Sequence, residues 1–275
     1  MRKHLRRVAL AGAMATAPLR TEPEFFIVGG KRCGTTSLQS WLDTHPAVIP
    51  SHSRKGTHYF DVNYDKGRTW FRAHFPTKAY TAVVRRRTGQ PAMSGEASPY
   101  YAFHPMALER LHAAVPDARV IFVLREPVER AYSHYLYEVR RGFEKLSFDE
   151  ALDAEEGRIA GEEERLRADP SYISFPHVHW TYQARGRYVE QIRRAVDLFG
   201  AEQVHLMEFD AMLSDPEVRQ RLLAFLGLDP HPSPTLPHHE RGGTTDVPAE
   251  AGARLREYFA ESKAALEKEF GIGFG

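Results

Sequence analysis

One segment near the N-terminus combines glycines, a lysine and hydroxyl side chains in an order that could bind a phosphate. The apolar run 25–28 before it predicts a short buried strand. Leu38, Trp41 and Leu42 after it have the spacing of one helical face. A glycine-bearing loop between a strand and a helix presents backbone N–H groups to an anion, and the helix dipole favours negative charge there. The residues that would form this phosphate loop are Lys31, Arg32, Cys33, Gly34, Thr35, Thr36 and Ser37.

The phosphate loop differs at one position from the loop of nucleoside triphosphatases, G-x-x-x-x-G-K-[ST]. Gly29 and Gly34 have the expected spacing, and Thr36 occupies the Ser/Thr position. The lysine position holds Thr35, whereas a lysine lies inside the loop as Lys31. The segment therefore argues against hydrolysis of ATP or GTP and favours another phosphate-bearing ligand. A plain glycine turn is the alternative, and the lysine with three consecutive hydroxyl residues makes it the weaker one.

A second anion-binding arrangement follows the strongest predicted strand, 119–124. Arg125 comes directly after this strand, at the edge where open α/β sheets bind ligands. Pro127 suits the first position of a helix, and Ser133 follows Arg125 by eight residues on that helix. A guanidinium and a helix-borne hydroxyl can together hold a phosphate. The alternatives are a helix-capping salt bridge for Arg125 and a solvated serine at Ser133.

Titratable side chains lie between these two segments. Lys55 and His58 stand among aromatic residues within one crossover of the phosphate loop, so we expect them to be functional rather than parts of a surface loop. Glu96 is a lone acid among small residues. It could cap a turn, but an acid at a strand end of an α/β sheet also faces the ligand crevice.

A late loop is the third candidate for anion binding. Residues 231–248 are rich in proline, glycine and histidine, and loops of this length in compact domains are often functional lids. Arg241 and Gly242 could fold over an anion there.

Length and composition are typical of one α/β domain with a sizeable core. The chain has 275 residues, of which 42% are hydrophobic and 27% are charged. A net charge of +1 provides no overall field for nucleic acid, so we expect no such partner. The single cysteine, Cys33, excludes an intrachain disulfide and a multi-cysteine metal site. His177 and His179 lack carboxylates at ligand spacing, so we expect no metal.

The N-terminus is the least defined part of the sequence. No run approaches the ~20 apolar residues that a membrane-spanning helix needs, so we expect no integral membrane segment. The first residues join a basic start to a short alanine-rich run, as a secretory signal peptide would. Because that run is weakly hydrophobic, we expect a disordered leader over 1–22 and one folded domain over 23–275. A signal peptide is the alternative.

Periodicity predicts an α/β fold in which helices flank both faces of a mostly parallel sheet, in a single domain. A third strand is expected at 204–207. We expect residues 81–92 to form a loop or sheet edge. Residues 143–170, rich in Glu, Arg and Ala, are expected to be a solvated and partly helical insert. Further helices are expected at 105–115, 187–199, 216–226 and 249–270.

Two of these segments resemble those of a known family. The stretch GGKRCGTTSL is similar to the 5′-phosphosulfate loop of sulfotransferases that use 3′-phosphoadenosine-5′-phosphosulfate (PAPS). The stretch IFVLREPVERAYSHYLYEVRRG, residues 121–142, resembles the 3′-phosphate block of that family. Both stand in the family's order. The similarity runs from about residue 25 to near the C-terminus and is closest to the heparan-sulfate-type and related bacterial enzymes.

The resemblance implies a P-loop-like fold and a reaction in which the sulfuryl group of PAPS moves to a hydroxyl or amine of an acceptor, leaving adenosine 3′,5′-bisphosphate. The acceptor would be a saccharide, lipid or other small molecule or natural product. No metal is implied, and a donor made in the cytosol implies a cytoplasmic location. The implied donor-binding residues are Lys31, Arg32, Cys33, Gly34, Thr35, Thr36, Ser37, Arg125, Ser133, Arg241 and Gly242.

Other classes of protein are compatible with the same segments. A P-loop small-molecule kinase is the first alternative, although Thr35 in the lysine position argues against it. A non-catalytic nucleotide-binding protein is the second alternative, because the sequence departs from its relatives at the catalytic base.

That departure lies in the stretch around His58. In heparan-sulfate-type enzymes the corresponding stretch carries a lysine, a catalytic glutamate and, two positions later, a histidine. Lys55 and His58 match the lysine and the histidine, but Gly56 occupies the glutamate position. A lysine that some relatives carry after the next acidic residue is also replaced, since Ala97 follows Glu96. The base must therefore come from elsewhere, or the protein is inactive.

We predict His58 as the catalytic base, because its unperturbed pKa of ~6.5 leaves it largely neutral at physiological pH. Glu96 is the second choice. Lys31 and Lys55 are predicted to stabilise negative charge on the transferring group and its leaving phosphate.

Overall fold

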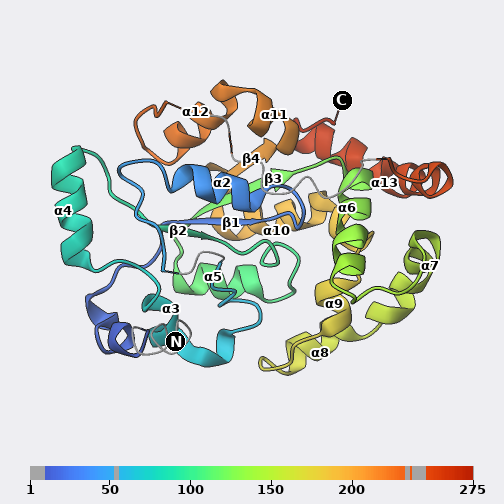
Figure 1. Cartoon of the computed structure of the whole chain (residues 1–275), viewed down its shortest axis with the longest axis horizontal. Coiled ribbons are helices and arrows are strands. Elements are labelled where there is room, and N and C mark those ends of the chain that lie inside the picture. The colour runs from blue at the N-terminus through green and yellow to red at the C-terminus, as the bar shows by residue number, and fades with distance from the viewer. Residues whose placement is uncertain (1–9, 53–55, 233–235, 237–245, 275) are drawn as a thin grey trace.

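A parallel β-sheet forms the centre of the molecule (Figure 1). The computed structural model of the protein describes residues 10–52, 56–232, 236 and 246–274, and in these its strands form one sheet in the order β2-β1-β3-β4. All neighbouring strands are parallel, which confirms the predicted α/β class. The strands are β1 (Phe25–Gly29), β2 (Gly95–Ala97), β3 (Arg119–Leu124) and β4 (Val204–Glu208).

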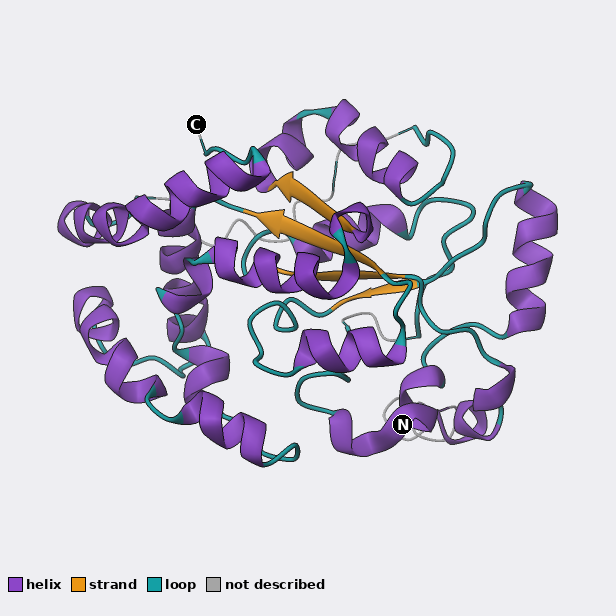
Figure 2. Ribbon diagram, turned by 180° about the vertical axis from the view of Figure 1, so that it is seen from behind, coloured by secondary structure: helices purple, strands orange, loops and turns teal. Residues whose placement is uncertain are grey.

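Helices cover both faces of this sheet, as parallel strands require (Figure 2). One layer contains α2 (Thr35–Leu42), α11 (Phe209–Ser214) and α12 (Pro216–Phe225). The other contains α5 (Ala107–Ala114), α10 (Tyr188–Phe199) and the end of α13 (Ala249–Phe270). The other helices are α3 (Gly67–Arg72), α4 (Lys78–Thr88), α6 (Pro127–Arg140), α7 (Phe148–Ile159), α8 (Glu162–Ala168) and α9 (Phe175–His179). Short 3₁₀ helices are η1 (Ala17–Leu19), η2 (Tyr64–Lys66), η3 (Ala184–Gly186) and η4 (Ala201–Gln203).

The central strands are apolar throughout because both of their faces are covered. Phe26 of β1 packs with Phe122 of β3 in the layer of α5 and α10. Phe25 and Ile121 pack in the layer of α2 and α12. Successive strand residues point to opposite faces, so an uninterrupted apolar strand serves two cores.

The neighbouring positions of β1 and β3 bring the two predicted anion-binding segments together. Gly29 pairs with Phe122, and the Gly30 N–H donates to the Val123 carbonyl over 2.7 Å. The phosphate loop and the segment that begins at Arg125 therefore leave the sheet side by side. This is the carboxyl edge, where parallel sheets bind ligands.

Local sequence signals account for the boundaries of α6. Pro127 is its first residue, as predicted, and the Glu126 carboxylate caps it by accepting hydrogen bonds from the Val128 and Glu129 N–H groups. Such capping satisfies N–H groups that have no partner within the helix. The start of the helix that carries Ser133 is thus set by its own sequence.

Two local predictions were wrong or incomplete. Residues 81–92 are not a loop or edge, since α4 covers most of them. The Thr77 hydroxyl caps this helix, and Gly89 ends it with a φ of 71°. Residues 143–170 form α7 and α8, with Phe148 and Leu152 in a core cluster, so this insert is not merely solvated.

Part of the expected leader has contacts with the rest of the molecule. Ala17 is 2% exposed, and the Arg20 guanidinium donates to the Phe75 carbonyl over 2.6 Å. Arg20 also forms an isolated antiparallel bridge with Thr77. The boundary at residue 23 stays a prediction.

Candidate functional site

The backbone of the phosphate loop is shaped for close approach. Gly34 has a φ of 78°, and a Cβ there would lie 2.5 Å from the Phe209 ring, so glycine is required for two reasons. In the described part of the chain, no side chain caps α2, which begins at Thr35. Its first N–H groups therefore lack a side-chain acceptor, and such a helix end binds anions.

The side chains of the loop divide between the core and the site. Cys33 is fully buried, and burial raises the pKa of its thiol, so it is not a reactive cysteine. Thr35 and Ser37 are also buried, whereas Thr36 is exposed. Cys33 can therefore contribute to ligand binding only through its backbone.

The two predicted anion-binding segments meet at Arg32 and Ser133. Arg32 Nε donates to Ser133 Oγ over 3.2 Å. Arg125 instead donates from Nη2 and Nε to Glu129 Oε2, over 2.7 and 3.1 Å. This ion pair matches the salt-bridge alternative for Arg125. Because the Glu129 side chain is 38% exposed, the pair contributes little stability and does not prevent Arg125 from binding a phosphate.

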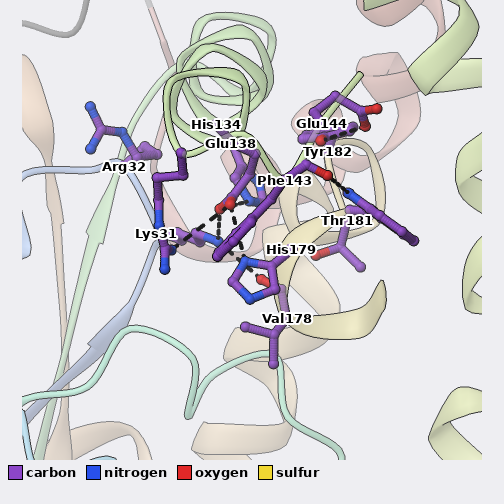
Figure 3. Close-up of polar contacts among 12 residues, drawn as sticks. Lys31, Arg32, His134, Glu138, Phe143, Glu144, Val178, His179, Thr181 and Tyr182 are labelled. Atoms are coloured by element: carbon purple, nitrogen blue, oxygen red, sulfur yellow. Dashed lines mark hydrogen bonds and ion pairs between the residues drawn. The ribbon is translucent and has the colours of Figure 1, made fainter. Parts of the chain in front are cut away.

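Lys31 is held by α6 and α9 (Figure 3). Its Nζ donates to Glu138 Oε1 over 2.6 Å and to the Val178 carbonyl over 3.0 Å. His179 Nδ1 lies 3.0 Å from Glu138 Oε2. In the close-up, Lys31 and His179 point toward the Glu138 carboxylate, whereas Arg32 points away from it. Lys31 and Arg32, which are neighbours in the loop, therefore contact two different groups: the Glu138 carboxylate and the Ser133 hydroxyl.

The charges of this cluster depend on burial and on mutual contacts. Burial, together with the charge of Arg185, lowers the pKa of Lys31 to about 7, although Glu138 acts in the opposite direction. Burial would raise the pKa of Glu138, but the neighbouring His134 and His179 imidazoles and the charge of Lys31 hold it well below its usual range. Glu138 is therefore an ionised, buried carboxylate.

Arg185 is a buried cation that sequence reasoning missed. Its Nη2 donates to the Val178 carbonyl over 3.1 Å, the same oxygen that Lys31 contacts. Its Nε donates to Thr181 Oγ1 over 2.6 Å, and burial lowers its pKa to about 10. In the described residues no carboxylate lies within ion-pair distance of this guanidinium. Its charge opposes protonation of both Lys31 and His58.

His58 forms a carboxylate–imidazole pair with Asp61. His58 Nδ1 lies 2.8 Å from Asp61 Oδ2, and the His58 side chain is 37% exposed. Burial acts to lower the pKa of His58, but the charge and hydrogen bond of Asp61 outweigh it, so the pKa is raised. When Nδ1–H donates to Asp61, Nε2 is the nitrogen that can accept a proton. Sequence reasoning did not identify Asp61.

Glu96 is fully engaged in structural hydrogen bonds. Its Oε2 accepts from the Thr57 N–H and its Oε1 from the Tyr101 hydroxyl, both over 2.6 Å. The residue is 1% exposed, and burial raises its pKa. Glu96 therefore supports the stretch that carries His58, and this geometry makes it a poor candidate for the base.

Gly56 lies where no side chain fits. Its N–H donates to the Ala97 carbonyl over 3.1 Å. A Cβ at this position would lie 2.1 Å from that oxygen and 2.2 Å from Ser98 Oγ. The backbone here therefore excludes the glutamate that the resembled family carries at the equivalent position.

We expect Gly56→Ala to lower the free energy of unfolding by about 1–3 kcal/mol, the usual cost of forcing extra atoms into a packed site. Gly157→Ala is the matched control, because a Cβ at Gly157 in α7 meets nothing within 4 Å and alanine favours a helix. Urea unfolding of both variants measures the difference. Equal stability of the two would contradict the packing argument.

The remaining predicted site residues are only partly placed. Lys55, Arg241 and Gly242 lie outside the described residues, so their roles stay predictions. His177 is buried and pairs with the Tyr100 hydroxyl over 2.7 Å, which makes it structural. Glu138 was missed, although it lies four residues after His134 on the same predicted helix, a spacing at which side chains can interact.

The comparison with family models decides the family. The model described as the sulfotransferase family matches residues 23–232. The chain belongs to the sulfotransferase family. This confirms the resemblance of the two segments.

Relatives within the sulfotransferase family agree with this assignment. A crystal structure of a sulfotransferase from Alicyclobacillus acidocaldarius is 31% identical, with a TM-score of 0.65, and the match covers 92% of this chain and 98% of that one. The membrane-associated sulfotransferase kil1 of Dictyostelium discoideum is 26% identical over 75% of this chain. Heparan sulfate glucosamine 3-O-sulfotransferase 5 of Mus musculus is 27% identical over 76%. The chain spans 56% and 54% of the lengths of these two curated relatives.

Two features of the described residues bear on partners. No described helix is long and apolar enough to cross a membrane. Among the same residues, no three His, Cys, Asp or Glu side chains are grouped as metal ligands.

Proposed function

We propose that this protein transfers the sulfuryl group of PAPS to a hydroxyl or amine of an acceptor. The observation that carries the proposal is the contact between Arg32 and Ser133, which joins the phosphosulfate-loop segment to the 3′-phosphate segment. Family membership supports the class of reaction. No observation favours the kinase or the non-catalytic alternative.

The residues present fit such a donor. The uncapped start of α2 and the backbone at Gly34, where a Cβ would collide with Phe209, suit a phosphosulfate. Arg125 and Ser133 are the residues that would hold the 3′-phosphate. Arg241 and Gly242, which we predict to close over the donor, belong to the proposal as well.

The chemistry needs a base and a cation. The sulfur–oxygen bond to the phosphate breaks as a bond from the acceptor oxygen or nitrogen to sulfur forms. The electron pair of the broken bond stays on the phosphate. We assign the acceptor proton to His58 Nε2, which Asp61 orients through Nδ1. Lys31, with Lys55 as a predicted partner, stabilises the charge that develops on the leaving phosphate.

The acceptor is proposed to be a carbohydrate. This part rests on the names of relatives such as the heparan sulfate 3-O-sulfotransferase. A screen of saccharide, lipid and small-molecule acceptors with labelled PAPS tests it. A cytoplasmic location is part of the same proposal, and cell fractionation tests it.

Adenosine 3′,5′-bisphosphate is expected to raise the melting temperature, because a ligand of the native state stabilises it. ATP should raise it much less. Arg125→Ala should weaken bisphosphate binding by about 1.5–3 kcal/mol, the range for a charge-assisted hydrogen bond. Thermal shift and calorimetry measure both effects. Equal protection by AMP would show that the 3′-phosphate is not recognised and would overturn the donor assignment.

A further inference from the structure

Glu138 is a fully buried carboxylate with a central place in the site. Its side chain is 0% exposed, and its two oxygens contact Lys31 Nζ over 2.6 Å and His179 Nδ1 over 3.0 Å. His134 Nε2 lies 3.4 Å from Oε1. The carboxylate thus connects α6, α9 and the phosphate loop (Figure 3).

The surroundings of Lys31 would favour loss of its proton if Glu138 were absent. The Lys31 side chain is 15% exposed, and Arg185 donates to the same Val178 carbonyl. A buried ammonium beside another cation is costly unless a carboxylate compensates for it. The charged and titratable groups facing Lys31 come from three elements. They are His134, Tyr137 and Glu138 of α6, Arg141 directly after α6, His179 of α9 and Arg185 of η3.

We propose that Glu138 is a positioning residue for Lys31: its carboxylate holds the amine beside the phosphate loop and supplies the negative charge that favours the protonated amine there. His179 fixes the carboxylate from its other oxygen. The functional consequence rests on the proposed function, in which Lys31 stabilises the leaving phosphate. The electrostatic consequence does not depend on that function.

The structure supplies a matched control. Glu144, six residues later, is also buried, with a side chain that is 1% exposed. It accepts hydrogen bonds from Arg158 over 2.6 Å and from the Tyr182 hydroxyl over 2.9 Å. Glu144→Gln therefore removes a buried, paired carboxylate of the same segment without touching Lys31.

The first experiment reads the protonation of Lys31 directly. Lysine labelled with ¹³C at Cε is titrated by NMR without any ligand, and Lys31→Arg identifies the signal. We expect a pKa of about 7 in the unmodified protein. Glu138→Gln should move the titration midpoint to a pH lower by about 1 to 3, as expected for removal of an adjacent opposite charge. Glu144→Gln should leave it unchanged, and Glu138→Asp, which keeps the charge, should retain most of the original value.

An unchanged Lys31 titration in Glu138→Gln would overturn the proposal. If that variant does not fold, Glu138→Asp decides: its longer ion pair must lower the Lys31 pKa by a smaller amount, and no change would again overturn the proposal.

The second experiment is the pH dependence of turnover with PAPS. The rate should fall at alkaline pH as Lys31 loses its proton, and in Glu138→Gln this fall should begin at lower pH. On the alkaline limb the variant should then be slower by about tenfold for each pH unit that separates the two midpoints, because each unit changes the protonated fraction tenfold.

If Glu138 had only a structural role, Glu138→Gln would lower the rate at all pH values, and the alkaline decrease would begin at the same pH as in the unmodified protein. That outcome would contradict the proposed positioning of Lys31. If the unmodified protein shows no transfer from PAPS, the proposed function fails, whereas the NMR titration still decides the effect of Glu138.

Discussion

His58→Ala is expected to lower kcat by about 10²–10⁴-fold, the usual contribution of general acid–base catalysis. Asp61 orients the His58 imidazole over 2.8 Å, and Gly56 leaves no room for the glutamate of related enzymes. Binding of adenosine 3′,5′-bisphosphate should be nearly unchanged, because His58 is assigned to the acceptor. Steady-state kinetics with labelled PAPS, together with calorimetry of bisphosphate binding, measure the two quantities.

Glu96→Gln is the comparison for this result. Glu96 accepts hydrogen bonds from the Thr57 N–H and the Tyr101 hydroxyl. In Glu96→Gln the amide NH₂ group would face one of these two donors, and that hydrogen bond would be lost. The variant should lose stability but retain more turnover than His58→Ala. Near-normal turnover of His58→Ala with an inactive, folded Glu96→Gln would identify Glu96 as the base instead.

The pH dependence provides a further check on the His58 assignment. A base acts in its neutral form, and the pKa of His58 is raised because Asp61 outweighs the effect of burial. The rate should therefore increase with pH through this raised value. Asp61→Asn removes the charge, so it should lower the pKa and move the rising limb to lower pH. If the rate of Asp61→Asn rises over the same pH range as that of the unmodified protein, His58 is excluded as the titrating base.

Lys31→Ala is expected to lower kcat by about 10²–10³-fold, the range for removal of one group that stabilises developing negative charge. It should also lower the free energy of unfolding by a few kcal/mol, because Glu138 is left as a buried carboxylate without its cation. Kinetics and urea unfolding separate the two effects.

The double variant Lys31→Ala with Glu138→Gln separates catalysis from stability. Removal of both charges should recover much of the stability, since no unpaired charge stays buried. Turnover should stay low. Recovery of turnover along with stability would show that Lys31 acts only in folding.

The sequence by itself determined the local features of this protein. The spacing of Gly29 and Gly34, the apolar run at 119–124 and Pro127 are local signals. They correctly predicted a glycine-bearing loop between a strand and α2, the strand β3 and the start of α6. Prediction failed for 81–92, where a helix with no buried residue shows no strong apolar periodicity. Its cap at Thr77 was the signal that was available.

Only the tertiary structure decided which side chains meet in the site. Lys31 and Glu138 are 107 positions apart, and Arg32 and Ser133 are 101 apart, so no local pattern couples them. The packing of β1 beside β3 and of α9 against the loop brings them together. The same packing fills the space at Gly56 with the Ala97 carbonyl. Protonation follows from this arrangement, because burial and neighbouring charges, rather than residue type, determine whether Lys31 and His58 carry a proton.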